Sequence, residues 1–183
     1  MASDGRFSRS FMSHEPARYD LFSRLLHWGI AAVMIYVMIV GYSLHFMTDA
    51  RIFAFFSVTN MSLALVLTPL MAARFIWRFF RPKVPYGDML QGHQKGLVHL
   101  LHEIFYLLIF VVLLSGFLML EHGFAVFGAI NFPRPIANLD VNRFFFAVHR
   151  YACIALSAMI VLHVAAVIKH HCFARQAILR RML

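Results

Sequence analysis

The side chains with the widest chemical range in this 183-residue chain are its 11 histidines, because an imidazole binds metal ions and exchanges protons near neutral pH. His149 and His163 lie 14 residues apart, and His27 and His45 lie 18 residues apart. At about 3.6 residues per turn, each spacing returns to nearly the same helix face, after a rise of about 21 Å and about 27 Å respectively. Two helices that carry these pairs would each present imidazoles at two depths.

The elements that must position these histidines are long apolar segments. Apolar residues make up 61% of the chain and charged residues 14%, whereas a soluble domain has about 45–50% and about 25%. This composition excludes an ordinary soluble globule, and the 20 Phe and 11 Met residues exclude a disordered chain. Four stretches reach the roughly 20 residues that cross a bilayer as a helix: His27–Met47, Ile52–Ala73, Leu97–Leu120 and Phe144–Ile168. The sequence therefore predicts an all-α fold, an integral membrane four-helix bundle.

The predicted spans divide the chain into an N-terminal segment over 1–26, a transmembrane domain over 27–168 and a basic tail over 169–183. Thirteen of the 17 Lys and Arg residues fall on one side of the membrane: Arg6, Arg9, Arg18, Arg24, Arg74, Arg78, Arg81, Lys83, Lys95, Lys169, Arg175, Arg180 and Arg181. The other side holds Arg51, Arg134, Arg143 and Arg150. By the positive-inside rule, both termini are cytoplasmic. The net charge of +9 then reflects orientation and contact with anionic lipid, and nucleic acid is not needed to explain it.

Three smaller features complete the predicted architecture. Pro69 is expected to kink the second helix without ending it. Gly123–Asp140 is the one connection long enough to form a small cap. Cys153 and Cys172 are separated by about 28 Å of helix, so they cannot form a disulfide with each other.

Depth in the predicted membrane sorts the histidines into two pairs. His27 and His163 approach the cytoplasmic boundary, while His45 and His149 approach the outer one. Ionisable residues within spans are costly and normally serve a site. Two stacked imidazole pairs in a helix bundle suit bis-histidine haem, and Gly41 leaves room for a flat macrocycle.

Two other interpretations of these histidines remain open. A histidine in a membrane helix is often a packing residue that hydrogen-bonds to a neighbouring helix. A histidine-lined proton or metal channel is the other alternative. It fits less well, because proton relays usually need carboxylates and Glu103 is the one acid within the spans, while zinc sites favour closer clusters with cysteine.

Three segments resemble the bacterial cytochrome b561 family, the four-helix membrane b-type cytochromes that include superoxide oxidase. They are SRLLHW at Ser23–Trp28, GLVHLLHEIFYLL at Gly96–Leu108 and VLHVAAVIKHHCFARQAILRRM at Val161–Met182, within a resemblance that runs from Tyr19 to Leu183. The resemblance implies haem b, the bacterial inner membrane, and electron transfer between a membrane quinone and an outer-face donor, for which superoxide is one candidate. If the chain is an enzyme, it is then a superoxide:quinone oxidoreductase. The alternatives are a membrane-anchor cytochrome subunit of a larger dehydrogenase, and a channel or structural descendant with reduced haem content.

The resemblance also implies which residues bind the iron. His27 and His163 match the ligands of the family's cytoplasmic-side haem, and His149 matches one ligand of the outer haem. The second outer ligand in the family is a histidine early in span two, where this chain has Asn60. An amide is a poor haem ligand, so one haem is expected, and the outer site has three possible outcomes. His45 replaces the missing ligand and a second haem binds, His149 holds that haem alone, or the outer haem is absent.

Further residues are candidates for contacts around these sites. Arg24 and Lys95 lie near the inner site by depth, and Arg143 and Arg150 near the outer one. Each of these cations could neutralise a haem propionate or could simply extend to the membrane surface. His102 and His170 are predicted to contact a quinone head group, because an imidazole can exchange the proton that accompanies an electron; the alternative is that both are solvated residues at helix ends.

Overall fold

The computed structural model describes residues 18–81, 92–173 and 179–182, with the side chains of residues 92–95, 173 and 181 left undescribed. Six of the basic residues used above to predict the orientation therefore lie outside the described residues or side chains: Arg6, Arg9, Lys83, Lys95, Arg175 and Arg181. The predicted N-terminal segment is described only from residue 18 onward.

Four long helices confirm the all-α membrane bundle. They are α1 (Leu21–Ser43), α2 (Ala50–Phe80), α3 (Gly92–Leu118) and α4 (Leu139–Ile168). All four contain a window long and apolar enough to cross a membrane. The short elements are η1 (Leu44–Phe46), the strands β1 (Phe124–Val126) and β2 (Ile130–Phe132), the π-helix η3 (Lys169–Phe173) and η4 (Leu179–Arg181). Pro69 lies inside the continuous helix α2, as predicted.

Short polar side chains fix where three of the helices begin. Asp20 caps α1 by accepting a hydrogen bond from the Ser23 backbone at 2.8 Å. Asp49 caps α2 by accepting from Arg51 and Ile52, and Asn138 caps α4 by accepting from the backbone of the first turn. These caps satisfy N–H groups that have no partner within their own helix.

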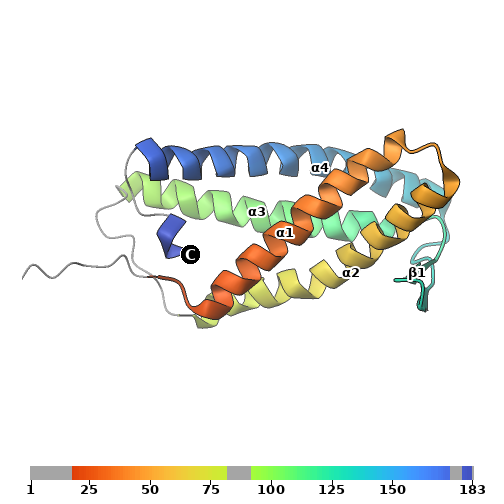
Figure 1. Cartoon of the computed structure of the whole chain (residues 1–183), viewed down its shortest axis with the longest axis horizontal. Coiled ribbons are helices and arrows are strands. Elements are labelled where there is room, and N and C mark those ends of the chain that lie inside the picture. The colour runs from red at the N-terminus through yellow and green to blue at the C-terminus, as the bar shows by residue number, and fades with distance from the viewer. Residues whose placement is uncertain (1–17, 82–91, 174–178, 183) are drawn as a thin grey trace, which may run out of the picture.

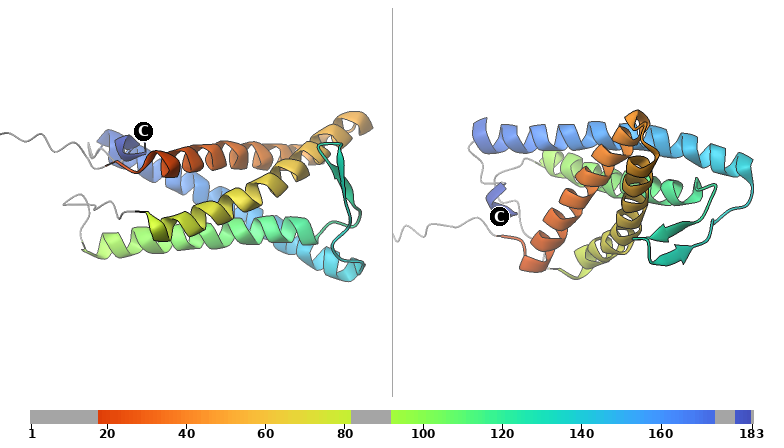
Figure 2. Two further views of the ribbon diagram at one scale, coloured as in Figure 1. Left: turned by 90° about the horizontal axis from the view of Figure 1, so that it is seen from below. Right: turned by 45° about the vertical axis from the view of Figure 1, so that its right-hand side comes forward.

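The helices pack as two antiparallel pairs, α1 with α2 and α3 with α4. Figure 1 shows that the described ends of the chain lie at one end of the bundle, while β1 lies at the other. In both views of Figure 2 the β-hairpin stays at that far end. The bundle therefore has a terminal end, where the described part of the chain begins and finishes, and a hairpin end.

The core occupies the middle of the bundle and takes side chains from all four helices. Its buried members are Ile30, Met34, Val37, Leu67, Met71, Val112, Leu113, Ala152 and Leu156. Many other large apolar side chains are exposed on the outside, as expected where lipid replaces water. This apolar middle separates the polar groups of the terminal end from those of the hairpin end.

The predicted cap over Gly123–Asp140 contains the hairpin of β1 and β2, paired antiparallel with Phe124 opposite Phe132. A Cβ atom at Gly123 would lie 2.5 Å from the Phe132 carbonyl oxygen, so this close approach requires glycine. The Phe127 N–H donates a 2.8 Å hydrogen bond to the fully buried Ser62 hydroxyl, which fixes the hairpin to α2.

Candidate functional site

The terminal end gathers one polar residue from each helix of the bundle. These residues are His27 on α1, Arg74 on α2, His102 on α3 and His163 on α4. His27 lies within electrostatic reach of the other three. Two predicted iron ligands and one predicted quinone contact are thus brought together at one depth, between the two helix pairs.

Arg74 holds His27 in place. Its Nη2 donates to His27 Nδ1 at 2.9 Å, and its Nη1 lies 3.5 Å from the Ser23 carbonyl oxygen. The ring of Trp28 packs edge-on against the His27 ring at a centroid distance of 5.4 Å. The sequence analysis counts Arg74 only among the basic residues of the cytoplasmic side and does not predict this contact. In the sequence, the one sign of a role for Arg74 is that its charge directly follows the predicted apolar span Ile52–Ala73.

His163 faces α3 on the other side of this cluster. Its ring meets Phe105 at 5.4 Å and His102 at 6.3 Å, both nearly edge-on. His102 Nδ1 lies 2.6 Å from the Val98 carbonyl oxygen and donates to it, so Nε2 of the neutral ring is a hydrogen-bond acceptor. His170, the other predicted quinone contact, is half-buried in η3, where α4 ends.

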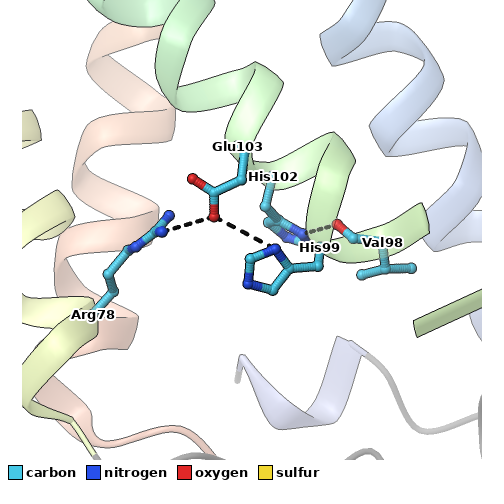
Figure 3. A network of polar contacts seen from close by, with 5 residues as sticks. All are labelled: Arg78, Val98, His99, His102 and Glu103. Carbon is cyan, nitrogen blue, oxygen red and sulfur yellow. Dashed lines mark hydrogen bonds and ion pairs between the residues drawn. The ribbon is translucent and has the colours of Figure 1, made fainter. Parts of the chain in front are cut away.

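Glu103 forms an ion pair that joins the two helix pairs. Its Oε1 lies 2.7 Å from Arg78 Nη2 on α2 and 3.6 Å from His99 Nδ1 on its own helix. Figure 3 shows Arg78 reaching across to this carboxylate, with His102 beside it on α3. The Arg78 guanidinium also stacks over the rings of Phe75, Phe79 and Tyr106. Glu103 is therefore the partner of a basic neighbour and not an unpaired carboxylate within the membrane.

Asp20 ties α1 to α2 just outside the spans. Its Oδ1 accepts from the Ser23 hydroxyl at 2.7 Å, and its Oδ2 accepts from Trp77 Nε1 at 3.2 Å. Desolvation acts to raise the pKa of Asp20, but these hydrogen bonds outweigh it and hold the pKa below its ordinary value. Asp20 therefore remains ionised and keeps the start of α1 against the end of α2.

The residues of the terminal end fit a haem. His27 and His163 supply two imidazoles from different helix pairs, the donor set of a bis-histidine iron. No group of three or more His, Cys, Asp or Glu side chains suited to a metal ion occurs within the described ranges, and a porphyrin would supply the remaining four ligands itself. Arg24, one turn before His27, has a buried Nε without a hydrogen-bond partner in the described part of the chain. A carboxylate such as a haem propionate would satisfy this N–H group.

The hairpin end places His149 against α3. Its Nδ1 lies 2.9 Å from the Val112 carbonyl oxygen and 3.3 Å from the Ser115 hydroxyl, and its Nε2 lies 3.5 Å from Cys153 Sγ. A Cβ atom at Gly116 would lie 2.8 Å from His149 Cε1, so the ring fills the space that this glycine leaves. A backbone carbonyl at Nδ1 is a contact that packing histidines and ligating histidines both make.

No hydrogen bond or ring contact joins the other predicted residues of the outer site to this ring within the described ranges. His45 is exposed in η1, beyond the end of α1, and Arg150 is exposed on α4. Asn60 faces Gly41 on α1, where a Cβ atom would lie 3.8 Å from Asn60 Nδ2. The buried Asn60 Oδ1 has no hydrogen-bond partner among the described residues. One imidazole and one amide do not fit bis-histidine haem.

Comparison with known proteins agrees with the resemblance noted in the sequence. A family model described as prokaryotic cytochrome b561 matches residues 18–183. This range includes all four helices and the hairpin. No match was found among curated proteins.

Proposed function

This chain belongs to the prokaryotic cytochrome b561 family, and we propose that a single haem b, bound between His27 and His163, carries its electron transfer. Membership makes it a multi-pass membrane b-type cytochrome that binds haem b. When bound, the haem supplies one-electron chemistry, and the protein supplies the ligands, the burial and the nearby charge. Two observations support the proposal. The two imidazoles come from different helix pairs, and the buried Arg24 Nε has no hydrogen-bond partner among the described residues.

The residues around this site have separate roles in the proposal. His27 and His163 would hold the iron. Arg24 would neutralise a propionate, and Arg74, which donates to His27 Nδ1 in this structure, would release that nitrogen when the ring binds iron. The outer candidates His45, His149 and Arg150 would hold no haem, because the hydrogen-bond partners of His149 among the described residues are a backbone carbonyl, a hydroxyl and a thiol, with no second imidazole among them.

The proposed electron partner is a membrane quinone near His102 and His170. His102 lies beside His163, and Nε2 of its neutral ring can accept the proton that a quinol releases as an electron moves. The location would be the bacterial inner membrane with the terminal end in the cytoplasm, since Arg18, Arg24 and Lys169 add to the arginines of α2 at that end.

The outer-face donor is the less supported part of the reaction. Superoxide would be attracted by the exposed Arg134, Arg143 and Arg150, but Asp140 lies 3.7 Å from Arg143 and partly cancels that charge. In a chain with one haem, an electron from this face would cross the outer half without a second iron. This favours a second candidate function, a membrane-anchor cytochrome that exchanges electrons with a dehydrogenase partner at the terminal end.

Stopped-flow absorption of the purified chain separates these functions. We expect a short-chain quinol to reduce the haem, and His102→Ala to slow this reduction while leaving the haem content unchanged. Superoxide added at the same concentration should reduce the haem more slowly than the quinol does. Rapid reduction by superoxide would support the oxidase-like reaction, and no reduction by either compound would support the anchor subunit.

A further inference from the structure

Three arginines near the end of α2 line one small cavity at the terminal end. Arg74 and Arg78 lie four residues apart on one face of the helix, and Arg81 is the residue that caps its C-terminus. The same cavity is lined by Trp77 and Tyr106, together with residues from the first turns of α1. It lies where α1 begins and α2 ends, at the boundary of the predicted spans.

Two of these three guanidinium groups lack a carboxylate partner in the described part of the chain. Arg78 is paired with Glu103, whereas Arg74 contacts His27 and the Ser23 carbonyl. Arg81 stacks on the Tyr19 ring at 4.5 Å. Arg74 and Arg81 are also close enough to repel each other electrostatically. An anion placed between them would remove that repulsion.

The nearby acidic side chain does not fill this role. Asp20 accepts hydrogen bonds from Ser23 and Trp77, and no ion pair joins it to the arginines within the described ranges. The cavity itself has a volume of about 20 Å³, which is the room that one water molecule or one phosphate oxygen needs. A phosphate would therefore place one oxygen inside and keep the others at the mouth, where planar guanidinium groups bind two oxygens at once.

We propose that this cavity binds the phosphate of an anionic phospholipid from the adjacent leaflet. Its position at the end of the spans sets it at the depth of lipid headgroups. Trp77 suits the same depth, because an indole prefers the membrane–water interface. Leu21, Leu25 and Phe79, which flank the site, are each more than 60% exposed and offer apolar surface to acyl chains.

Lipid retention in native mass spectrometry tests this site. The full-length haem-loaded protein would be titrated in detergent with dioleoyl phosphatidylglycerol, and separately with dioleoyl phosphatidylcholine. We expect phosphatidylglycerol to be retained preferentially, and Arg81→Gln to weaken its binding about fivefold, the effect of one interfacial cation. Arg81→Lys, which keeps the charge, should lose less affinity. Arg51→Gln is the matched control, since Arg51 is an exposed arginine at the opposite end of the same helix.

The comparison has clear contrary outcomes. Equal losses in the Arg81 and Arg51 variants would show a general charge effect and would overturn the proposal. So would competition by millimolar inorganic phosphate, which would assign the cavity to a free anion instead of a lipid. Haem absorbance measured on each sample confirms that the variants fold, and it reports on the haem proposal independently of lipid binding.

Discussion

A 2.9 Å hydrogen bond joins Arg74 Nη2 on α2 to His27 Nδ1 on α1. It connects a predicted iron ligand to a cation that is itself oriented by the Ser23 carbonyl. Because arginine can only donate, this bond places the proton of a neutral His27 on Nε2. Iron binding through Nε2 would require that proton to move to Nδ1, so Arg74 would have to release His27 before the ring binds a haem.

Replacing Arg74 by Ala should raise haem affinity. The hydrogen bond from Arg74 to His27 Nδ1, worth about 1.5–3 kcal/mol, must break when iron takes Nε2; the variant avoids this loss, so haem affinity should rise by up to roughly ten- to a hundredfold. Titration of the haem-free protein with haemin measures the affinity, and Arg51→Ala, at the exposed far end of α2, is the control. Equal or lower affinity of the Arg74 variant would show that this bond does not oppose haem binding.

Replacing Asp20 by Asn should destabilise the contact between α1 and α2. Asn can still cap the helix, but the loss of the negative charge at the N-terminus of α1 costs about 0.3–1 kcal/mol, and the Trp77 bond is weakened with it. The folded-state pKa of Asp20 is depressed, so its stabilisation is fully present above the ordinary carboxyl pKa and is lost as the pH falls through the lowered value. Thermal unfolding in detergent between about pH 3 and pH 7 should show this acid loss in the wild type. The Asn variant should lack it; an identical pH profile would contradict the role of Asp20.

Replacing Gly116 by Ala should destabilise the hairpin end. The new Cβ atom would lie 2.8 Å from His149 Cε1, and overpacking of this kind costs about 1–3 kcal/mol. His149→Ala in the same chain should relieve most of that cost, which a double-mutant cycle of thermal unfolding would reveal. Gly29→Ala is the matched control, because nothing lies within 4 Å of its added Cβ atom. Additive effects of the Gly116 and His149 changes would mean that the two residues are not in contact.

The bundle and its inner imidazole pair could be predicted because both depend on local patterns. Apolar length determines a span, and His27 and His163 fall where two spans approach the same boundary. The position of His45 could not be extrapolated in this way. Helix α1 ends at Ser43 and continues as the 3-10 helix η1, whose tighter winding breaks the five-turn register assumed from the spacing.

The roles of Arg74 and His149 depend on which helix lies opposite. A spacing of 14 residues places His149 and His163 on one face of α4. Their neighbours on α3 differ, because His149 meets a backbone carbonyl and the space beside Gly116, whereas His163 meets aromatic rings. Likewise, α2 continues to Phe80, beyond the predicted end of its span. Near this end Arg78 pairs with Glu103 and Arg74 donates to His27. Arg81, which caps the helix, stacks on Tyr19. Such pairings arise from packing between helices that are distant in the sequence.

Haem stoichiometry tests the central proposal most directly. A pyridine haemochrome assay on purified protein, normalised to chain concentration, should give one haem b per chain for the wild type, one for His149→Ala, one for His45→Ala and none for His163→Ala. Two haems per wild-type chain, with the loss of one in the His149 variant, would contradict the single inner site between His27 and His163.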